Sequence, residues 1–239
     1  HGSTVTETDG SFSILFTAKP DLSVSEEDEP VFEYKIHADV TDTAGETRSS
    51  ERFVIAGYTA LQAAIQTETW QTPDEPVEFT VTTQSLEGQP EPAEGTLQVY
   101  TLKQPDKVAR ANLESTERQL DSSNPDTWEL KDLVGEYPFE TDSQGRATLS
   151  VELQAGIYRA MLQTNDRFGK PVTARRTIHV VDPQVEHFDV RLANHFDAPK
   201  WSLEPGETFM ALWGTGYNTG SAYVELECRG RLLRAWWTD

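Results

Sequence analysis

The chain has few cysteines and basic residues and lacks long apolar runs, and each of these shortages excludes a class of structure or partner. It contains a single cysteine, Cys228, so no disulfide can form within it. It has no apolar run of 18 residues and no signal-peptide pattern at its start, so we expect no direct insertion into a membrane. Basic residues are also scarce: 20 Lys and Arg stand against 40 Asp and Glu, a formal charge of -20. An acidic surface repels phosphate backbones, which argues against a nucleic-acid partner.

Catalytic and cofactor motifs are missing as well. The sequence has no H-E-x-x-H, no G-x-S-x-G nucleophile elbow and no glycine-rich phosphate loop. A structural or surface role is expected for each of the five histidines, which are His1, His37, His179, His187 and His195. We therefore predict that the chain is not an enzyme, with no catalytic residue, no metal ligand and no cofactor. The residues that bind a partner stay unknown at this stage.

Turn acids and tryptophans are the remaining candidates for a site. Carboxylates at turns cap backbone N–H groups, the role we expect for Asp9, Asp42, Asp142 and Asp166. Whether one of them also binds calcium stays open, since no dense D-x-D-x-D loop is present. The tryptophans of "RAWWTD", with Trp201 and Trp213, could form a sugar platform, but packing in a core is the more common use of tryptophan.

Short alternating segments fill most of the chain. "SFSILFT", "VFEYKIHADV", "VEFTVTTQ", "GTLQVYTL" and "GIYRAMLQTN" place apolar residues at every second position, as half-buried strands do. Turn residues separate them, as in "TDTAGE" and "TPDEP". The pattern predicts an all-β fold of tandem antiparallel β-sandwiches, similar to immunoglobulin or fibronectin domains. Residues 104–136 interrupt it, and we expect there an insertion with one surface helix.

Two groups of motifs occur twice in the same order. Thr8-Asp9 corresponds to Thr141-Asp142, Tyr34 to Tyr158, and Asp42-x-x-Gly45 to Asp166-x-x-Gly169. In addition, "TPDEPVEFTV" resembles "LEPGETFMAL". The repetition predicts three parts: 1–57, the back half of one unit; 58–182, a complete unit that carries the 104–136 insertion; and 183–239, the front half of another. The chain has no initiator methionine and stops after "RAWWTD", so we expect a piece of a longer protein.

These turn motifs resemble those of macroglobulin-like domains in bacterial alpha-2-macroglobulin-family proteins. The resemblance rests on Pro205-Gly206-Glu207, Thr141 to Gly145, Ala155 to Tyr158 and Asp166 to Gly169. It implies a secreted or periplasmic cell-envelope protein in which serial sandwiches form a scaffold. Family members that trap proteases carry a bait segment and a Cys-Gly-Glu-Gln thioester. Cys228 lies in "ELECRGRLL" and lacks the residues that would follow it in a thioester.

Two functions from different classes stay open. The first is a non-catalytic structural and interaction module, part of a protease-inhibitor scaffold, whose partners are neighbouring domains and proteases. The alternative is a carbohydrate-binding or adhesive sandwich of a secreted protein. An enzyme with its site in the insertion is a weaker third, because that segment has no histidine and no cysteine. The two half units would expose apolar faces and strand edges, so we also expect copies of the chain to associate through their terminal segments.

Overall fold

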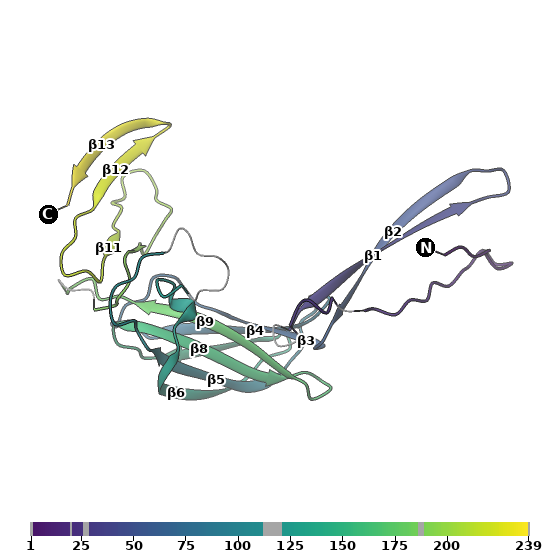
Figure 1. Cartoon of the computed structure of the whole chain (residues 1–239), viewed down its shortest axis with the longest axis horizontal. Coiled ribbons are helices and arrows are strands. Elements are labelled where there is room, and N and C mark those ends of the chain that lie inside the picture. The colour runs from purple at the N-terminus through teal and green to yellow at the C-terminus, as the bar shows by residue number, and fades with distance from the viewer. Residues whose placement is uncertain (1, 20, 26–28, 112–120, 186–188, 239) are drawn as a thin grey trace.

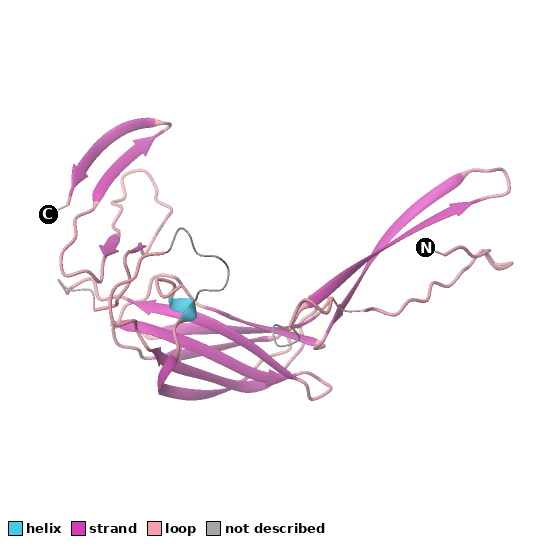
Figure 2. Ribbon diagram, viewed as in Figure 1, coloured by secondary structure: helices cyan, strands magenta, loops and turns pink. Residues whose placement is uncertain are grey.

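A computed structural model describes residues 2–19, 21–25, 29–111, 121–185 and 189–238. The described residues form an all-β fold, as predicted (Figure 2), with several antiparallel sheets and, in that part of the chain, one helical turn. That turn is the 3-10 helix η2, Pro125–Thr127. The surface helix expected in the insertion falls largely on 112–120, outside the described residues. No helix in the described ranges is long and apolar enough to cross a membrane.

Seven strands form a sandwich in the middle of the molecule (Figure 1). One sheet has three strands in the order β3 (Leu61–Gln66), β4 (Val77–Ser85) and β7 (Arg146–Val151). The other has four strands in the order β6 (Leu130–Glu140), β5 (Glu94–Leu102), β8 (Gly156–Asn165) and β9 (Pro171–Val180). All neighbours are antiparallel. A three-plus-four arrangement of this kind is the fibronectin-like sandwich architecture.

The core of this sandwich comes from the alternating residues of its strands. Val77, Phe79 and Val81 on β4 are 0% exposed, as are Leu97 and Val99 on β5. The residues between them face outward, because successive side chains of a strand point to opposite sides of the sheet. Leu149 of β7 packs against the same buried cluster as Val99. Strands on the two sides of the insertion therefore share one core.

The segment 104–136 is only partly outside the sheets. β6 starts at Leu130 and pairs with β5 as far as Glu140, so the excursion ends before β6. The first part of β6 is exposed on both faces, which explains why its sequence lacks clear alternation. Trp128, just before the strand, is buried and donates its indole N–H to the carbonyl of Ser122 at 2.9 Å.

A long two-stranded hairpin precedes the sandwich. β1 (Val31–Thr41) and β2 (Thr47–Gly57) pair antiparallel over their whole length and project away from the sandwich (Figure 1). The hairpin leaves large apolar side chains in water: Phe53 is 55% exposed. Residues 11–17, expected as a strand, form none in the structure. They lack a partner strand, although Phe16 still contacts Tyr34 with ring centroids 5.6 Å apart.

The third segment follows the sandwich at the opposite end from the β1–β2 hairpin (Figure 1). It consists of two antiparallel pairs. The first is β10 (His195–Asp197) with β11 (Leu212–Gly214), and the second is β12 (Tyr223–Cys228) with β13 (Arg231–Trp237). The same order of pairing occurs in the sandwich, where β3 pairs with β4 and β5 with β6.

Five turns in the described residues share one hydrogen-bond pattern. The N–H of the first residue donates to the carbonyl of the fifth, and a glycine with positive φ at the fourth position donates to the carbonyl of the first. The turns are 7–11, 42–46, 85–89, 142–146 and 166–170. A three-residue loop with a left-handed glycine is a common hairpin connection. The recurring glycines of the turn motifs in the sequence thus have one geometric cause, the left-handed fourth position of this turn.

One detail of the repeat differs from the sequence comparison. The first residue of the 7–11 turn is Glu7, so Glu7 and not Asp9 takes the place that Asp142 holds in its turn. Asp9 instead accepts hydrogen bonds from the backbone and side chain of Ser11. The alignment of Thr8-Asp9 with Thr141-Asp142 is therefore wrong by two positions, because Asp9 is the third residue of its turn and Asp142 is the first.

Candidate functional site

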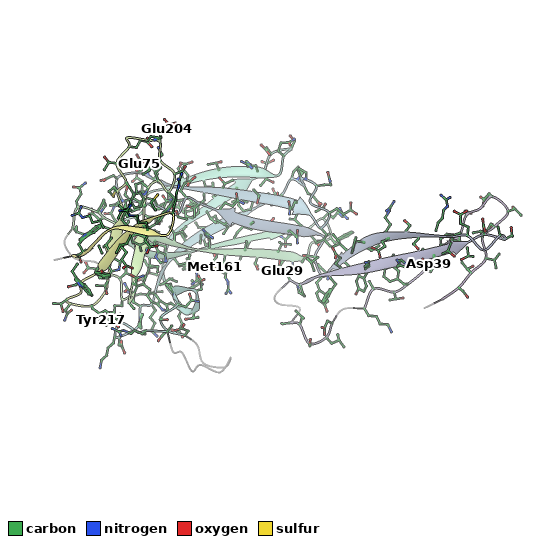
Figure 3. All side chains as sticks on the ribbon, turned by 90° about the horizontal axis from the view of Figure 1, so that it is seen from above. Glu29, Asp39, Glu75, Met161, Glu204 and Tyr217 are labelled. Carbon is green, nitrogen blue, oxygen red and sulfur yellow. The ribbon has the colours of Figure 1, made fainter. Side chains whose placement is uncertain are left out.

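The hairpin meets the sandwich at a joint made of hydrogen bonds. Oε1 of Glu29 accepts from the backbone N–H of Thr173 at 2.8 Å and from its hydroxyl at 3.0 Å. Nζ of Lys170 donates to the carbonyl of Tyr58 at 2.8 Å. Glu29 marks this joint in Figure 3. The ring of Phe32 packs edge-on against Tyr58 with centroids 6.1 Å apart. The contacts fix the hairpin to one end of the sandwich.

Asp166 links the turn between β8 and β9 to this joint. Its Oδ1 caps the N–H groups of Phe168 and Lys170 at 2.9 Å each, and its Oδ2 accepts from Ala60 N at 2.8 Å. Burial acts to raise the pKa of Asp166, but the three N–H donors and the Lys170 charge outweigh it and lower the pKa. As predicted, this aspartate caps backbone groups, and Asp42 and Asp142 cap their turns in the same way.

The other end of the sandwich packs against the third segment. Leu102, Trp128 and Ile157 of the sandwich end form a buried cluster with Val190 and Leu192. Hydrogen bonds join the same two parts: the backbone N–H of Arg191 donates to Oε1 of Gln104 at 2.7 Å, and its guanidinium donates to the carbonyl of Pro105 at 2.7 Å. Residues of the excursion thus connect the sandwich to the segment that follows it.

Two histidine rings stack at this joint. His179 near the end of β9 and His195 at the start of β10 have ring centroids 5.2 Å apart and an interplanar angle of 23°. Burial lowers the pKa of His179 to about 4, with the charge of His195 adding to the effect and Asp126 and Asp197 opposing it. Burial also lowers the pKa of His195, against the pull of Asp197. Both rings are therefore neutral at pH 7.

A polar cleft of about 350 Å³ lies beside this pair. Its lining residues are Asn124, Pro125, Asp126, Arg175, Arg176, Thr177 and His179. Arg159, which is buried, donates from Nε to the Thr177 hydroxyl at 2.8 Å and from Nη2 to the Pro125 carbonyl at 2.8 Å. The Thr177 hydroxyl in turn donates to Asp126.

Polar side chains at this cleft form hydrogen bonds that connect separate elements of the sandwich. The hydroxyl of Thr177 accepts a hydrogen bond from Nε of Arg159 and donates one to the carboxylate of Asp126, so it links the two charged side chains. In the described residues, Nδ1 of His179 is buried and makes no hydrogen bond. The arrangement ties η2 to β8 and β9, which holds the excursion against the four-stranded sheet.

The remaining histidines and the cysteine lie apart from one another. His37 is exposed on the β1–β2 hairpin, between Glu51 and Asp39. His1 and His187 lie outside the described residues. Cys228 is an exposed free thiol at the turn between β12 and β13, opposite Arg231. Within the described ranges, no three His, Cys, Asp or Glu side chains gather where they could hold a metal ion.

The aromatic residues of the third segment form a tilted cluster. Trp201 is 60% exposed, and its ring centroid lies 5.7 Å from that of Phe196 with an interplanar angle of 69°. The centroid of Phe209 lies 5.8 Å from that of Trp201, with an interplanar angle of 50°. Tyr223 and Trp237 are tilted by 45°. Rings at these angles do not make a flat surface for the face of a sugar.

The histidine pair is the feature that the sequence did not predict. His179 and His195 are 16 positions apart in segments that were assigned to different units. Their contact depends on how two separate pairs of strands pack at the joint. No local pattern of residues could have indicated it.

Comparison with known proteins adds little to these observations. No protein-family model matches the chain, and no curated protein does. Similar solved structures include trypsin-activated alpha-2-macroglobulin from Escherichia coli, with 14% identity and a TM-score of 0.36 over 72% of this chain. Salmonella alpha-2-macroglobulin reacted with methylamine has 13% identity and a TM-score of 0.36 over 84%. The chain spans 14% and 15% of those proteins, so its function has to be argued from its own residues.

Proposed function

We propose that this chain is a non-catalytic structural and interaction module of a larger, alpha-2-macroglobulin-like protein of the cell envelope, extracellular or periplasmic. The observation that carries the proposal is a seven-stranded sandwich with a two-stranded hairpin before it and two antiparallel strand pairs after it, which we interpret as one complete unit between two partial ones. The β1–β2 hairpin before it has the same kind of aspartate turn as the β8–β9 hairpin and a tyrosine at the same distance before that turn. The segment after it repeats the order of pairing of β3 with β4 and of β5 with β6. Serial units joined in this way form scaffolds.

The two joints support the same proposal. Each connects the sandwich to its neighbour by hydrogen bonds between side chains and the backbone, and the second adds a buried apolar cluster. Contacts of this kind hold successive units at a defined angle. The partners of the module are then the neighbouring domains of the full-length protein. A role in a protease-inhibitor scaffold, with proteases as partners, is the finer form of this proposal.

The carbohydrate-binding alternative has no comparable support. The exposed aromatic rings are tilted against one another. Trp201 precedes the second Pro-rich turn motif as Trp70 precedes the first, and Met210, next to Phe209, aligns with Phe79 of the sandwich. Phe79 is part of the core of the complete unit. The exposed rings of the third segment are thus better explained as core residues of a second unit of the same kind.

Exposure of the chain to methylamine and to generic peptide and glycoside substrates tests the absence of chemistry. We expect the mass of the folded protein to stay unchanged and no substrate to turn over, because Cys228 is a free thiol at an exposed turn. The Cys228→Ser variant is the control and should behave identically. A gain in mass of the parent chain that the Cys228→Ser variant does not show, or turnover of any substrate, would refute the proposed function.

A further inference from the structure

The strands β1 and β12 each have one edge that is paired and one that is open. The strands of the sandwich to which we compare them, β8 and β5, are paired on both edges. In the described residues, β1 pairs only with β2, and β12 only with β13. In the four-stranded sheet, β8 pairs with both β9 and β5, and β5 with both β6 and β8. By this comparison, the open edge of β1 would accept a strand of the β5 kind, and the open edge of β12 would accept a strand of the β8 kind.

The equivalence of β1 with β8 rests on two contacts. The hydroxyl of Tyr34 donates to the carbonyl of Lys19 at 2.6 Å, as that of Tyr158 does to the carbonyl of Gln154 at 2.9 Å. In sandwiches of the immunoglobulin type, a tyrosine near the start of this strand bonds back to the backbone a few residues upstream, as Tyr158 does. Tyr34 bonds back in the same direction, but to a carbonyl 15 residues upstream. In both cases the shared aspartate turn begins eight residues after the tyrosine, at Asp42 and at Asp166.

The equivalence of β12 with β5 rests on sequence and pairing. "GSAYVEL", from Gly220, aligns with "GTLQVYT", from Gly95, and each strand is followed by its hairpin partner along the chain. Val224 then takes the position of Val99, which is fully buried. Glu225 takes the position of Tyr100, whose side chain lies on the other face of the sheet.

We propose that β1 and β12 are complementary edges and that each pairs with the other in a second copy of this chain. The inference rests on the proposed repeat. It predicts an antiparallel sheet in the order β13, β12, β1 and β2, where the last two strands come from the second copy. Within one molecule the two edges lie at opposite ends and cannot meet (Figure 1). The contact is therefore head-to-tail, and such contacts produce rings or open chains.

The register of the new pair follows from the existing one. Val99 is opposite Ala160 and Tyr100 opposite Arg159. Transferred to the equivalent positions, Val224 faces Ile36 and Glu225 faces Lys35. The first pair is apolar on the inner side, and the second joins opposite charges on the outer side. Both Val224 and Ile36 are only half-buried in the single molecule, so the pairing removes apolar surface from water. It also satisfies the backbone groups of two open edges.

Cysteine cross-linking tests the register directly. In a Cys228→Ser background, a Lys35→Cys variant is mixed with a Glu225→Cys variant under mild oxidation. We expect a covalent heterodimer, because directly opposed residues of antiparallel strands have Cα atoms about 4.5 to 5.5 Å apart, within disulfide range. The matched control replaces Lys35→Cys by Glu51→Cys. Glu51 lies on β2, one strand further away, so we expect roughly tenfold less product.

Sedimentation of the parent chain completes the test. The sedimentation coefficient should rise with concentration, and deletion of 1–57 or of 189–239 should abolish that rise. A chain that stays monomeric, or equal cross-linking by the Lys35→Cys and Glu51→Cys variants, would overturn the inference. Neither result involves turnover or a mass gain at Cys228, so failure here is distinguishable from failure of the proposed function.

Discussion

Replacement of Phe79 by alanine should lower the free energy of unfolding of the sandwich by about 3 to 5 kcal/mol. Phe79 is 0% exposed at the centre of the core, between the two sheets. The loss combines the transfer free energy of a phenyl ring with the cost of the cavity that remains. Urea unfolding followed by circular dichroism measures it, since the midpoint shifts while the slope stays constant.

Phe209 provides the matched control for this prediction. It lies in the second Pro-rich turn motif, next to Met210, which aligns with Phe79, but it is 47% exposed and packs against Trp201. Phe209→Ala should change the unfolding free energy of the sandwich by less than about 0.5 kcal/mol, as exposed substitutions do. Equal losses at the two positions would mean that the third segment shares the core of the sandwich, contrary to the proposed division.

Acidification from pH 7 to pH 4 should remove about 3 kcal/mol of stability through His179 alone. Burial lowers the folded-state pKa of this ring to about 4 from 6.5. In this window the unfolded chain binds a proton that the folded chain does not, so stability falls as the pH falls from 6.5 towards 4. Protonation would also place a charge against the stacked ring of His195, 5.2 Å away.

A His179→Gln variant should flatten the pH dependence of the unfolding free energy between pH 6.5 and 4. His195 keeps part of the slope, because burial lowers its pKa in the same direction. His37→Gln is the matched control, since His37 is exposed on the hairpin, and it should leave the slope of the sandwich transition unchanged. An unaltered slope in His179→Gln would show that the stacked pair does not govern acid sensitivity.

Alternation and turn residues predicted the fold class because each of them has a local physical cause. The period of two in "VEFTVTTQ" follows from strand geometry, and Gly45, Gly145 and Gly169 are needed where φ is positive. The start of β6 was missed because this edge strand is exposed on both faces and therefore has no alternation to detect. The strand expected at 11–17 was wrong because a strand needs a partner, which local pattern cannot supply.

The candidate site was less predictable than the fold. The capping role of Asp42, Asp142 and Asp166 follows from turn chemistry and could be predicted. The stacking of His179 on His195, and the bonds of Arg159 to Thr177 and Pro125, depend on contacts between segments far apart in the sequence. A single sequence gives the chemical types of these residues but not their proximity.

Native-state amide hydrogen exchange tests the central claim, one complete sandwich between two open half units, most directly. In dilute solution, amides of β4, β5 and β8 should exchange only through global unfolding, whereas those of β1 and β12 should exchange through local opening, with much smaller free energies. In a longer chain that includes the neighbouring natural sequence on both sides, β1 and β12 should become as protected as β8 and β5. Equal protection of all these strands in the chain alone, or no gain of protection in the longer chain, would contradict the account.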